Sequence, residues 1–480
     1  MMEVTRKNPL APIVDQRDNT SEPVGKRSRQ EEKVGAVLTQ QQEKYLESLS
    51  KIYADHPDLK GLVVRLEQVR QELLVNPERA CVIEESSNVS RKMYVTRDEV
   101  HIVQKKAGEG SYSMVFFTVA MLFKDATIVN RVVKVSDEPF DKEVEILNGL
   151  SPASKTSNKI DHFIGSFYIP NLESNLAVFE PSDCDFTAID YTKIILPVFF
   201  ICKQLCNVLE GIASFHRQDI VLRDIKGANL LANIEGAGKV TDFGYLMKVK
   251  PEGEKHDATA SVFYVAPYIW TSILGQKYWE YDESNPVSGG YQGKAVDVFA
   301  IGRVIQFDIF QEMIKQFGEQ YSVPVAHFVD VQNAPRLIEG DYTDEELLEF
   351  DKAYPGRVFR DAANDVEDED RLYIFEDRAT ALENTQQVIN KFRGRLPKGE
   401  IRRMEQLAEL AMQLQNPSKE GLQSFLGVNH ENDQDLLIMA VFQKMKKIKC
   451  LAVPSLLFDP SSPSGEEVPS VVINHSIGEG

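Results

Sequence analysis

The sequence predicts an α+β fold in which strand-forming and helix-forming regions are separated along the chain. Short apolar runs typical of strands lie between about residues 95 and 180, at 100–103, 116–123, 131–135 and 175–180. Amphipathic helical patterns precede this region, and a long apolar helix is expected at 194–216. Strands and helices grouped in this way are typical of α+β proteins.

The composition of the chain argues against several classes of protein. The 480 residues leave room for two or three domains, or for one large domain with appendages. Lys and Arg number 54 against 73 Asp and Glu, a formal charge of −19 that argues against nonspecific nucleic-acid binding. The five cysteines form no C-x-x-C pair, and no apolar run reaches about 18 residues. We therefore expect a soluble, cytoplasmic protein without zinc or an integral membrane segment.

Residues 1–93 are expected to form an N-terminal extension. About the first 30 residues are polar and contain proline, which predicts disorder. Tyr45, Leu49 and Ile52 then follow a helical period, and a second helix presents an apolar face between Leu59 and Leu73. A helical hairpin docked on the next domain explains this pattern best, and a partner-binding element remains the alternative.

A glycine-containing turn separates the first two predicted strands of the main domain. Gly108, Gly110, Ser113 and Val115 form the run G-x-G-x-x-S-x-V. Glycines allow a hairpin to close over phosphates with its N–H groups facing the anion. Lys134 lies in the next apolar strand, where a lysine is costly unless it is paired. We therefore expect Lys134 to contact the phosphates of a nucleotide.

The stretch 221–244 carries the strongest chemical signal. It reads V-L-R-D-I-K-G-A-N-L-L, then a short turn, then K-V-T-D-F-G. Asn229 and Asp242 offer oxygen atoms of the kind that Mg²⁺ prefers. Asp224 would then be free to accept a proton from a substrate.

The combination of R-D-x-K-x-x-N with T-D-F-G resembles the catalytic loop and D-F-G segment of eukaryotic-type protein kinases. The resemblance covers about 95–310 well and 400–430 weakly. It implies a bilobal protein-kinase-like domain at 94–430, with a β-rich N-lobe (94–181), a helical C-lobe (182–430) and an insertion at about 311–400. A C-terminal segment and flexible tail would follow at 431–480. An outlying member, such as a bacterial effector acting in host cytoplasm, is the nearest analogy.

The resemblance also implies roles for single residues. Asp224 would be the catalytic base, and Lys226 would neutralise charge on the transferring phosphoryl group. Asn229 and Asp242 would hold Mg²⁺, which Mn²⁺ could replace. Lys134 would hold the ATP phosphates.

The family pairs this lysine with a glutamate on the next helix. Glu143 is the best match, although it follows Lys134 by only nine residues, a shorter interval than the family shows. The glutamate would then lie in the first turns of a truncated helix. Glu145 is the alternative.

The strand at 175–180 leads into a segment that resembles the family's hinge, which binds adenine through its backbone. Phe179 would close the back of the pocket, while Glu180 offers its carbonyl and Ser182 its N–H. Val132 and Leu231 complete the expected nucleotide-binding set. An ordinary strand end remains the alternative for this stretch.

Further positions carry the resemblance into the C-lobe. Asp297 would support the backbone of the catalytic loop. Arg223 could pair with a phosphate on Thr259, and Ser261 would face the substrate. The competing reading pairs Arg223 with a carboxylate already present, on Glu252, Glu254 or Asp257. Tyr268 replaces the family's glutamate, so the ion pair that this acid makes should be absent.

The resemblance implies a Ser/Thr protein kinase that uses ATP and Mg²⁺ and acts on a protein substrate. A pseudokinase or scaffold that binds nucleotide and a partner without turnover is the main alternative. A small-molecule phosphotransferase is third, because those enzymes typically lack a lysine at the position of Lys226. A protein partner could bind the N-terminal helices or the insertion at 311–400. The acidic run 361–370 is expected to be a solvated loop rather than a calcium site.

Overall fold

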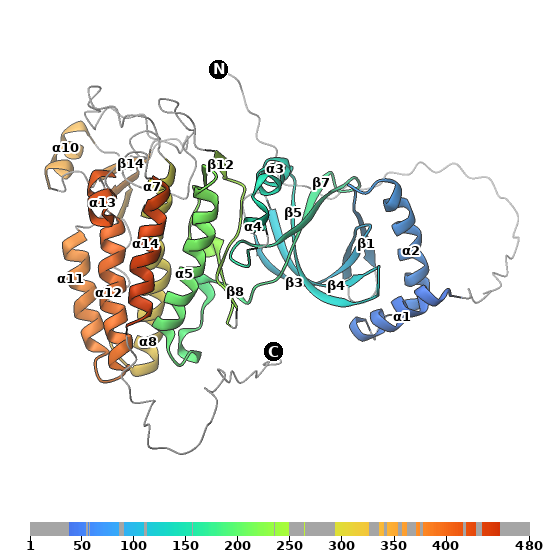
Figure 1. The fold of residues 1–480 in the computed structure, drawn as a ribbon, viewed down its shortest axis with the longest axis horizontal. Helices are drawn as coiled ribbons and strands as arrows, with labels where there is room; N and C mark the ends of the chain where they lie inside the picture. The colour runs from blue at the N-terminus through green and yellow to red at the C-terminus, as the bar shows by residue number, and fades with distance from the viewer. Residues whose placement is uncertain are drawn as a thin grey trace, which may run out of the picture.

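The computed structural model describes two lobes (Figure 1). It covers residues 38–53, 56, 58–85, 91–109, 113–155, 157–234, 236–248, 264, 293–325, 336–339, 343–353, 358–361, 371–374, 378–415, 419–428 and 434–451. Strands dominate the part of the chain before residue 180, and long helices dominate the part after it. This arrangement confirms the predicted α+β bilobal fold.

The N-lobe is built on a seven-stranded antiparallel sheet with the order β1-β2-β3-β4-β5-β7-β6. Its strands are β1 (Cys81–Glu85), β2 (Arg91–Val95), β3 (Glu99–Glu109), β4 (Ser113–Leu122), β5 (Ile128–Ser136), β6 (Phe163–Ile169) and β7 (Ser174–Phe179). The four predicted strands correspond to β3, β4, β5 and β7. The predicted boundary between residues 93 and 94 falls inside β2, because Met93 pairs with Ile102 of β3 and continues the same sheet.

The two edges of this sheet meet, so that the N-lobe closes into a barrel. The amide of Ala80 donates to the carbonyl of Tyr168 at 2.8 Å, and the amide of Tyr168 donates to the carbonyl of Glu78 at 2.9 Å. These bonds join the chain just before β1 to β6. The interior is filled by apolar side chains, among them Tyr94, Val133, Val135, Leu176 and Val178.

The N-terminal helices dock on the outside of this barrel, as the preferred interpretation predicted. They are α1 (Gln40–Ile52), which begins with a capping box at Thr39, and α2 (Leu59–Val75). Tyr45 donates its hydroxyl to the carbonyl of Phe123 at 2.7 Å, and Ser48 donates to the carbonyl of Ala126 at 2.7 Å. Leu49, Leu62 and Leu66 pack in one buried cluster with Met93, Ile102 and Met121 of the sheet.

The remaining short elements link the two lobes. The helices α3 (Asp141–Gly149) and α4 (Pro152–Lys155) follow β5. The short strands β8 (Cys184–Asp185), β9 (Ile220–Val221), β10 (Leu230–Ala232), β11 (Lys239–Val240) and β12 (Met247–Lys248) form two small sheets around the start of the C-lobe. They position the loops that carry the predicted chemistry.

The C-lobe core forms around α5 (Pro197–His216). The helix α7 (Gly293–Val304) continues through a π-helical turn (Ile305–Gln311) into α8 (Glu312–Tyr321). The helices α12 (Lys398–Leu414), α13 (Lys419–Leu426) and α14 (Gln434–Lys449) complete the bundle (Figure 1). By length and composition α5 could cross a membrane, but 72% of its apolar window is buried inside the protein, as in a core helix.

Two predicted boundaries in the C-lobe differ from the structure. The predicted insertion at 311–400 is narrower, because Met313 and Phe317 of α8 and Ile389 of α11 (Arg378–Lys391) are buried in the C-lobe core. Between these helices lie α10 (Asp344–Ala353) and a small sheet of β13 (Arg336–Glu339), β14 (Val358–Asp361) and β15 (Arg371–Ile374). The predicted domain end at 430 is too early, since Leu437 and Val441 of α14 belong to the same core.

Candidate functional site

One buried carboxylate accepts hydrogen bonds from the backbone of the loop that follows β9. Asp297 of α7 is fully buried and accepts hydrogen bonds from the amides of Leu222 and Arg223, each at 2.9 Å. His216, at the end of α5, lies 2.8 Å from the same carboxylate through Nε2. Arg223 adopts a left-handed backbone with φ of 71°. The predicted support by Asp297 is therefore confirmed, while His216 was not foreseen.

Asp224 lies at the centre of this loop and is 5% exposed. Its Oδ2 accepts from Nζ of Lys226 at 2.8 Å and from Nδ2 of Asn229 at 2.9 Å. Nδ2 of Asn229 also donates to the carbonyl of Asp224 at 2.8 Å. Since the amide nitrogen of Asn229 is turned toward Asp224, its Oδ1 is the atom that can face a cation.

Lys134 of β5 brings the N-lobe chemistry to the same place. Its Nζ lies 2.8 Å from Oδ1 of Asp242 and 3.9 Å from Oε1 of Glu143. Burial lowers the pKa of Lys134, but the carboxylates of Asp242 and Glu143 more than offset that effect and raise it overall. Lys134 is therefore a cation at neutral pH.

The structure places Glu143, and not Glu145, beside this lysine. The helix α3 begins at Asp141, so Glu143 lies in its first turn, as the short sequence interval predicted. Burial raises the pKa of Glu143, and Lys134 acts in the opposite direction. Asp242 makes the shorter contact with Lys134, in a left-handed backbone with φ of 59°.

Exchanging Glu143 for glutamine tests this pair. We expect Glu143→Gln to lower turnover about tenfold or more, because a shift of a positioning group by about 1 Å can cost up to about a hundredfold. Glu145→Gln is the matched control on the exposed side of the same helix and should be silent. Steady-state phosphate transfer at varied ATP measures both. A silent Glu143→Gln would show that the first turn of α3 does not support the lysine.

The remaining nucleotide-binding candidates lie along three adjacent strands. Val115 of β4 pairs with Lys134 of β5, and Val132 pairs with Phe179 of β7. A Cβ built on Gly108 would meet no described atom within 4 Å, so the space beside Gly108 is open. Ser113 begins β4, and Gly110 lies outside the described residues.

The hinge stretch runs from β7 to β8. The amide of Glu180 donates to the carbonyl of His162 at 3.1 Å, and its own carbonyl is the group predicted to meet adenine. Phe179 is 6% exposed and its ring packs against Phe163, with centroids 5.7 Å apart. Ser182 lies between β7 and β8 in the sequence. Leu231 of β10 pairs with Asp185 of β8, the strand that follows this segment. Thr259, Ser261 and Tyr268 lie outside the described residues.

Comparison with known proteins agrees with this geometry. Residues 101–336 match the family model described as the protein kinase domain. Residues 101–336 thus form a protein kinase domain. Curated relatives include the serine/threonine-protein kinase STE11 of Saccharomyces cerevisiae, 42% identical over 67 residues, covering 13% of this chain and 9% of the relative. MAP3K epsilon protein kinase 2 of Arabidopsis thaliana is 31% identical over 109 residues, 23% of this chain and 7% of the relative.

A longer match is the serine/threonine-protein kinase pakC of Dictyostelium discoideum, 24% identical over 237 residues. It covers 47% of this chain and 45% of the relative. The chain therefore spans less than half of the length of each of these relatives. The likeness concerns the kinase domain, and the N-terminal hairpin falls before the residues that the family model matches.

The kinase domain contains a second support for its catalytic loop that sequence reasoning missed. Asp308 lies in the π-helical turn after α7, and its Oδ2 accepts from the amide of Gly227 at 2.7 Å. Its Oδ1 accepts from the hydroxyl of Tyr264 at 2.7 Å. A Cβ on Gly227 would lie 2.6 Å from Cγ of Asp308, so a larger residue would displace this carboxylate. No motif marks Asp308, because the π-helical turn that aims it is visible only in the structure.

Asp308 should matter through its acceptor atoms more than through its charge. We expect Asp308→Ala to lower turnover about tenfold to a hundredfold, because the loop that carries Asp224 and Lys226 loses an anchor. Asp308→Asn can retain one oxygen for the amide of Gly227 and should lose less than about threefold. Burial raises the pKa of Asp308. Equal losses in both variants, measured as turnover in folded protein, would contradict this role.

Proposed function

We propose that the chain is a Ser/Thr protein kinase that transfers the γ-phosphoryl group of ATP to a protein hydroxyl. The observation that carries the proposal is that two clusters adjoin, Lys134 with Asp242 and Asp224 with Lys226 and Asn229. The amide of Thr241, next to Asp242, donates to the carbonyl of Asn229 at 3.1 Å and so joins them. These are the positions at which phosphoryl transfer needs cations, metal ligands and a base.

In this proposal Asp224 orients the substrate hydroxyl and accepts its proton. The contacts from Lys226 and Asn229 fix its carboxylate before substrate arrives. Lys226 lies 2.8 Å from that carboxylate, so its ammonium group can also neutralise charge on the phosphoryl group as it moves. Lys134 holds the phosphates of ATP from the N-lobe side.

The donor set also fits a divalent metal ion. Oδ1 of Asn229 and the carboxylate of Asp242 would hold Mg²⁺, or Mn²⁺ in its place, and both are oxygen donors suited to a hard cation. Such an ion, when bound, would supply positive charge for the phosphates of ATP. The side chain of Asp242 is 37% exposed, so it remains accessible to such an ion.

A kinase-like scaffold that binds nucleotide without turnover is the second candidate. The observation in its favour is that Glu143 stands 3.9 Å from Lys134, while Asp242, which would have to bind metal, makes the closer contact at 2.8 Å. A small-molecule phosphotransferase is a third candidate. The contact between Lys226 and Asp224 at 2.8 Å favours transfer to a protein substrate over both alternatives.

Incubation of purified protein with radiolabelled ATP, Mg²⁺ and generic protein substrates separates these candidates. Label on serine or threonine of the substrate, lost in Asp224→Asn, supports the proposal. Saturable ATP binding without transfer supports the scaffold, and ATP consumption that depends on a small metabolite supports the third candidate. The five free cysteines agree with work in a reducing cytoplasm, which we propose as its compartment.

A further inference from the structure

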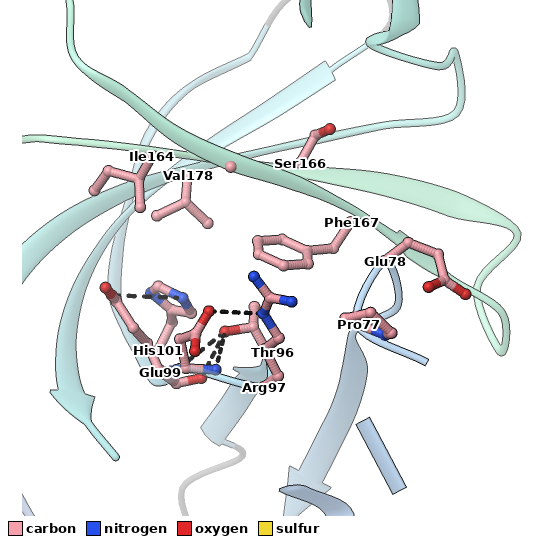
Figure 2. Close-up of a pocket in the computed structure, with 12 residues that line it drawn as sticks. Pro77, Glu78, Thr96, Arg97, Glu99, His101, Ile164, Ser166, Phe167 and Val178 are labelled. Atoms are coloured by element: carbon pink, nitrogen blue, oxygen red, sulfur yellow. Dashed lines mark hydrogen bonds and ion pairs between the residues drawn. The ribbon is translucent and has the colours of Figure 1, made fainter. Parts of the chain in front are cut away.

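The N-lobe barrel contains a cavity at one end, on the side of the β2–β3 turn. Its volume is about 340 Å³, within the range of small-ligand pockets. One wall is apolar and comes from Ile164 and Phe167 of β6 and Val178 of β7. The opposite wall carries Arg97, Glu99 and His101 from β3 and the turn before it. Figure 2 shows the rings of Phe167 and His101, the side chain of Val178 and the guanidinium of Arg97 around the same space.

His101 is the unusual group in this wall. Its side chain is fully buried, and neither ring nitrogen makes a hydrogen bond within the described part of the chain. Burial, together with the nearby Arg131, lowers the pKa of His101 to about 3, so the imidazole is neutral. A neutral imidazole has one N–H donor and one acceptor nitrogen. Buried polar atoms normally have partners, so these atoms call for a partner that the described residues do not supply.

The charges around His101 are already balanced. Glu99 is 7% exposed, and its two carboxylate oxygens accept from Nε and Nη2 of Arg131 at 3.0 and 3.2 Å. Its Oε2 lies 3.9 Å from Nε2 of His101, beyond hydrogen-bond distance. Arg97 donates to the carboxylate of Asp98 at 2.9 Å. A buried ionic ligand would therefore find its counter-charges taken, which favours a neutral one.

We propose that this cavity is a binding site for a small neutral molecule with an apolar ring or chain and one amide or hydroxyl group. The apolar part would lie on Phe167, Ile164 and Val178. An amide or a hydroxyl can both donate and accept, so either group can pair with His101 in whichever tautomer it presents. The site stands apart from the nucleotide site, and its existence does not depend on phosphoryl transfer.

The position of the cavity links it to the hinge. Val178 and Phe179 are consecutive in β7, so their side chains point to opposite faces of the sheet. Val178 lines the cavity, whereas Phe179 packs with Phe140 and Ala177 on the face that carries α3. A molecule in the cavity would therefore lie directly behind the strand that leads into the hinge.

Benzamide is a suitable probe, because it combines one apolar ring with one neutral amide. The full chain, labelled with ¹⁵N at histidine, is titrated with benzamide while a non-hydrolysable ATP analogue and Mg²⁺ saturate the nucleotide site. We expect a saturable shift of the His101 ring signals that the nucleotide does not abolish. Ethylbenzene, which lacks the amide, should bind at least tenfold more weakly.

Two variants locate the site. His101→Phe keeps a buried ring without nitrogens, and Val178→Phe fills the cavity from the opposite wall; each should weaken benzamide at least tenfold. His162→Phe, at an exposed histidine nearby, should not. Undiminished binding to either variant, displacement by nucleotide, or no binding at the solubility limit overturns the proposal. If a variant fails to fold, a crystal of the native chain soaked in benzamide tests the site instead. Electron density for water alone beside His101 would also overturn the proposal.

Discussion

Asp242→Asn is expected to reduce phosphoryl transfer by at least about a thousandfold while the protein stays folded. A carboxylate that holds a metal ion on the ATP phosphates acts where charge develops, and losing one such stabilising group costs roughly a hundred- to a thousandfold by itself. Here the substitution also removes the anion that lies 2.8 Å from Lys134, so two groups lose their partner. Turnover with labelled ATP measures the loss of phosphoryl transfer. A thermal unfolding curve shows whether the variant stays folded.

The chain offers a close control in Asp219→Asn. Asp219 is also in a left-handed backbone, with φ of 55°, and it also pairs with a lysine, Lys294, at 2.7 Å. Its side chain is 72% exposed, and it lies outside the cluster around Asp224. Asparagine tolerates a left-handed backbone, so neither variant should strain the chain. Full turnover in Asp242→Asn, or an equal loss in Asp219→Asn, would remove Asp242 from the proposed metal site.

The parts of the fold that the sequence predicted are those with a strong local pattern. The strands β3, β4, β5 and β7 carry contiguous apolar runs, and α1 and α2 have one apolar face each. By contrast, β1 and β2 are short strands of five residues each, and in each of them two adjacent charged residues interrupt any apolar period. Their apolar residues are buried only when the barrel closes and α1 and α2 pack on it. The local sequence of β1 and β2 therefore does not predict these strands.

The candidate site divides in the same way. Asp224, Lys226, Asn229 and Asp242 lie in one short stretch, so the motif they form, and the family that it resembles, predicted their roles. Asp308 and His101 depend on segments far away in the sequence: Asp308 meets Gly227 across 81 residues. Such residues act through tertiary contacts, and only the folded chain identifies them.

The buried ion pair that joins three C-lobe helices should give the largest change in stability. Glu400 of α12 accepts from the amides of Val198 and Phe199 at 2.7 and 3.3 Å, at the start of α5. Arg403, 2% exposed, donates to Glu400 at 2.9 Å and to the carbonyls of Lys449 and Leu451 at the end of α14. We expect Arg403→Met to lower the free energy of unfolding by about 3–5 kcal/mol, because it leaves a buried carboxylate without its counter-charge.

The pH dependence and two further variants distinguish this explanation from lost packing. Burial already raises the pKa of Glu400, and removal of the arginine should raise it further, so the deficit should shrink as the pH falls and the carboxyl becomes protonated. Adding Glu400→Gln to Arg403→Met should restore part of the stability at neutral pH. Arg393→Met breaks a pair with Glu405 whose arginine is 57% exposed, and should cost no more than about 1 kcal/mol. A deficit in Arg403→Met that is independent of pH in urea unfolding would assign the loss to packing alone.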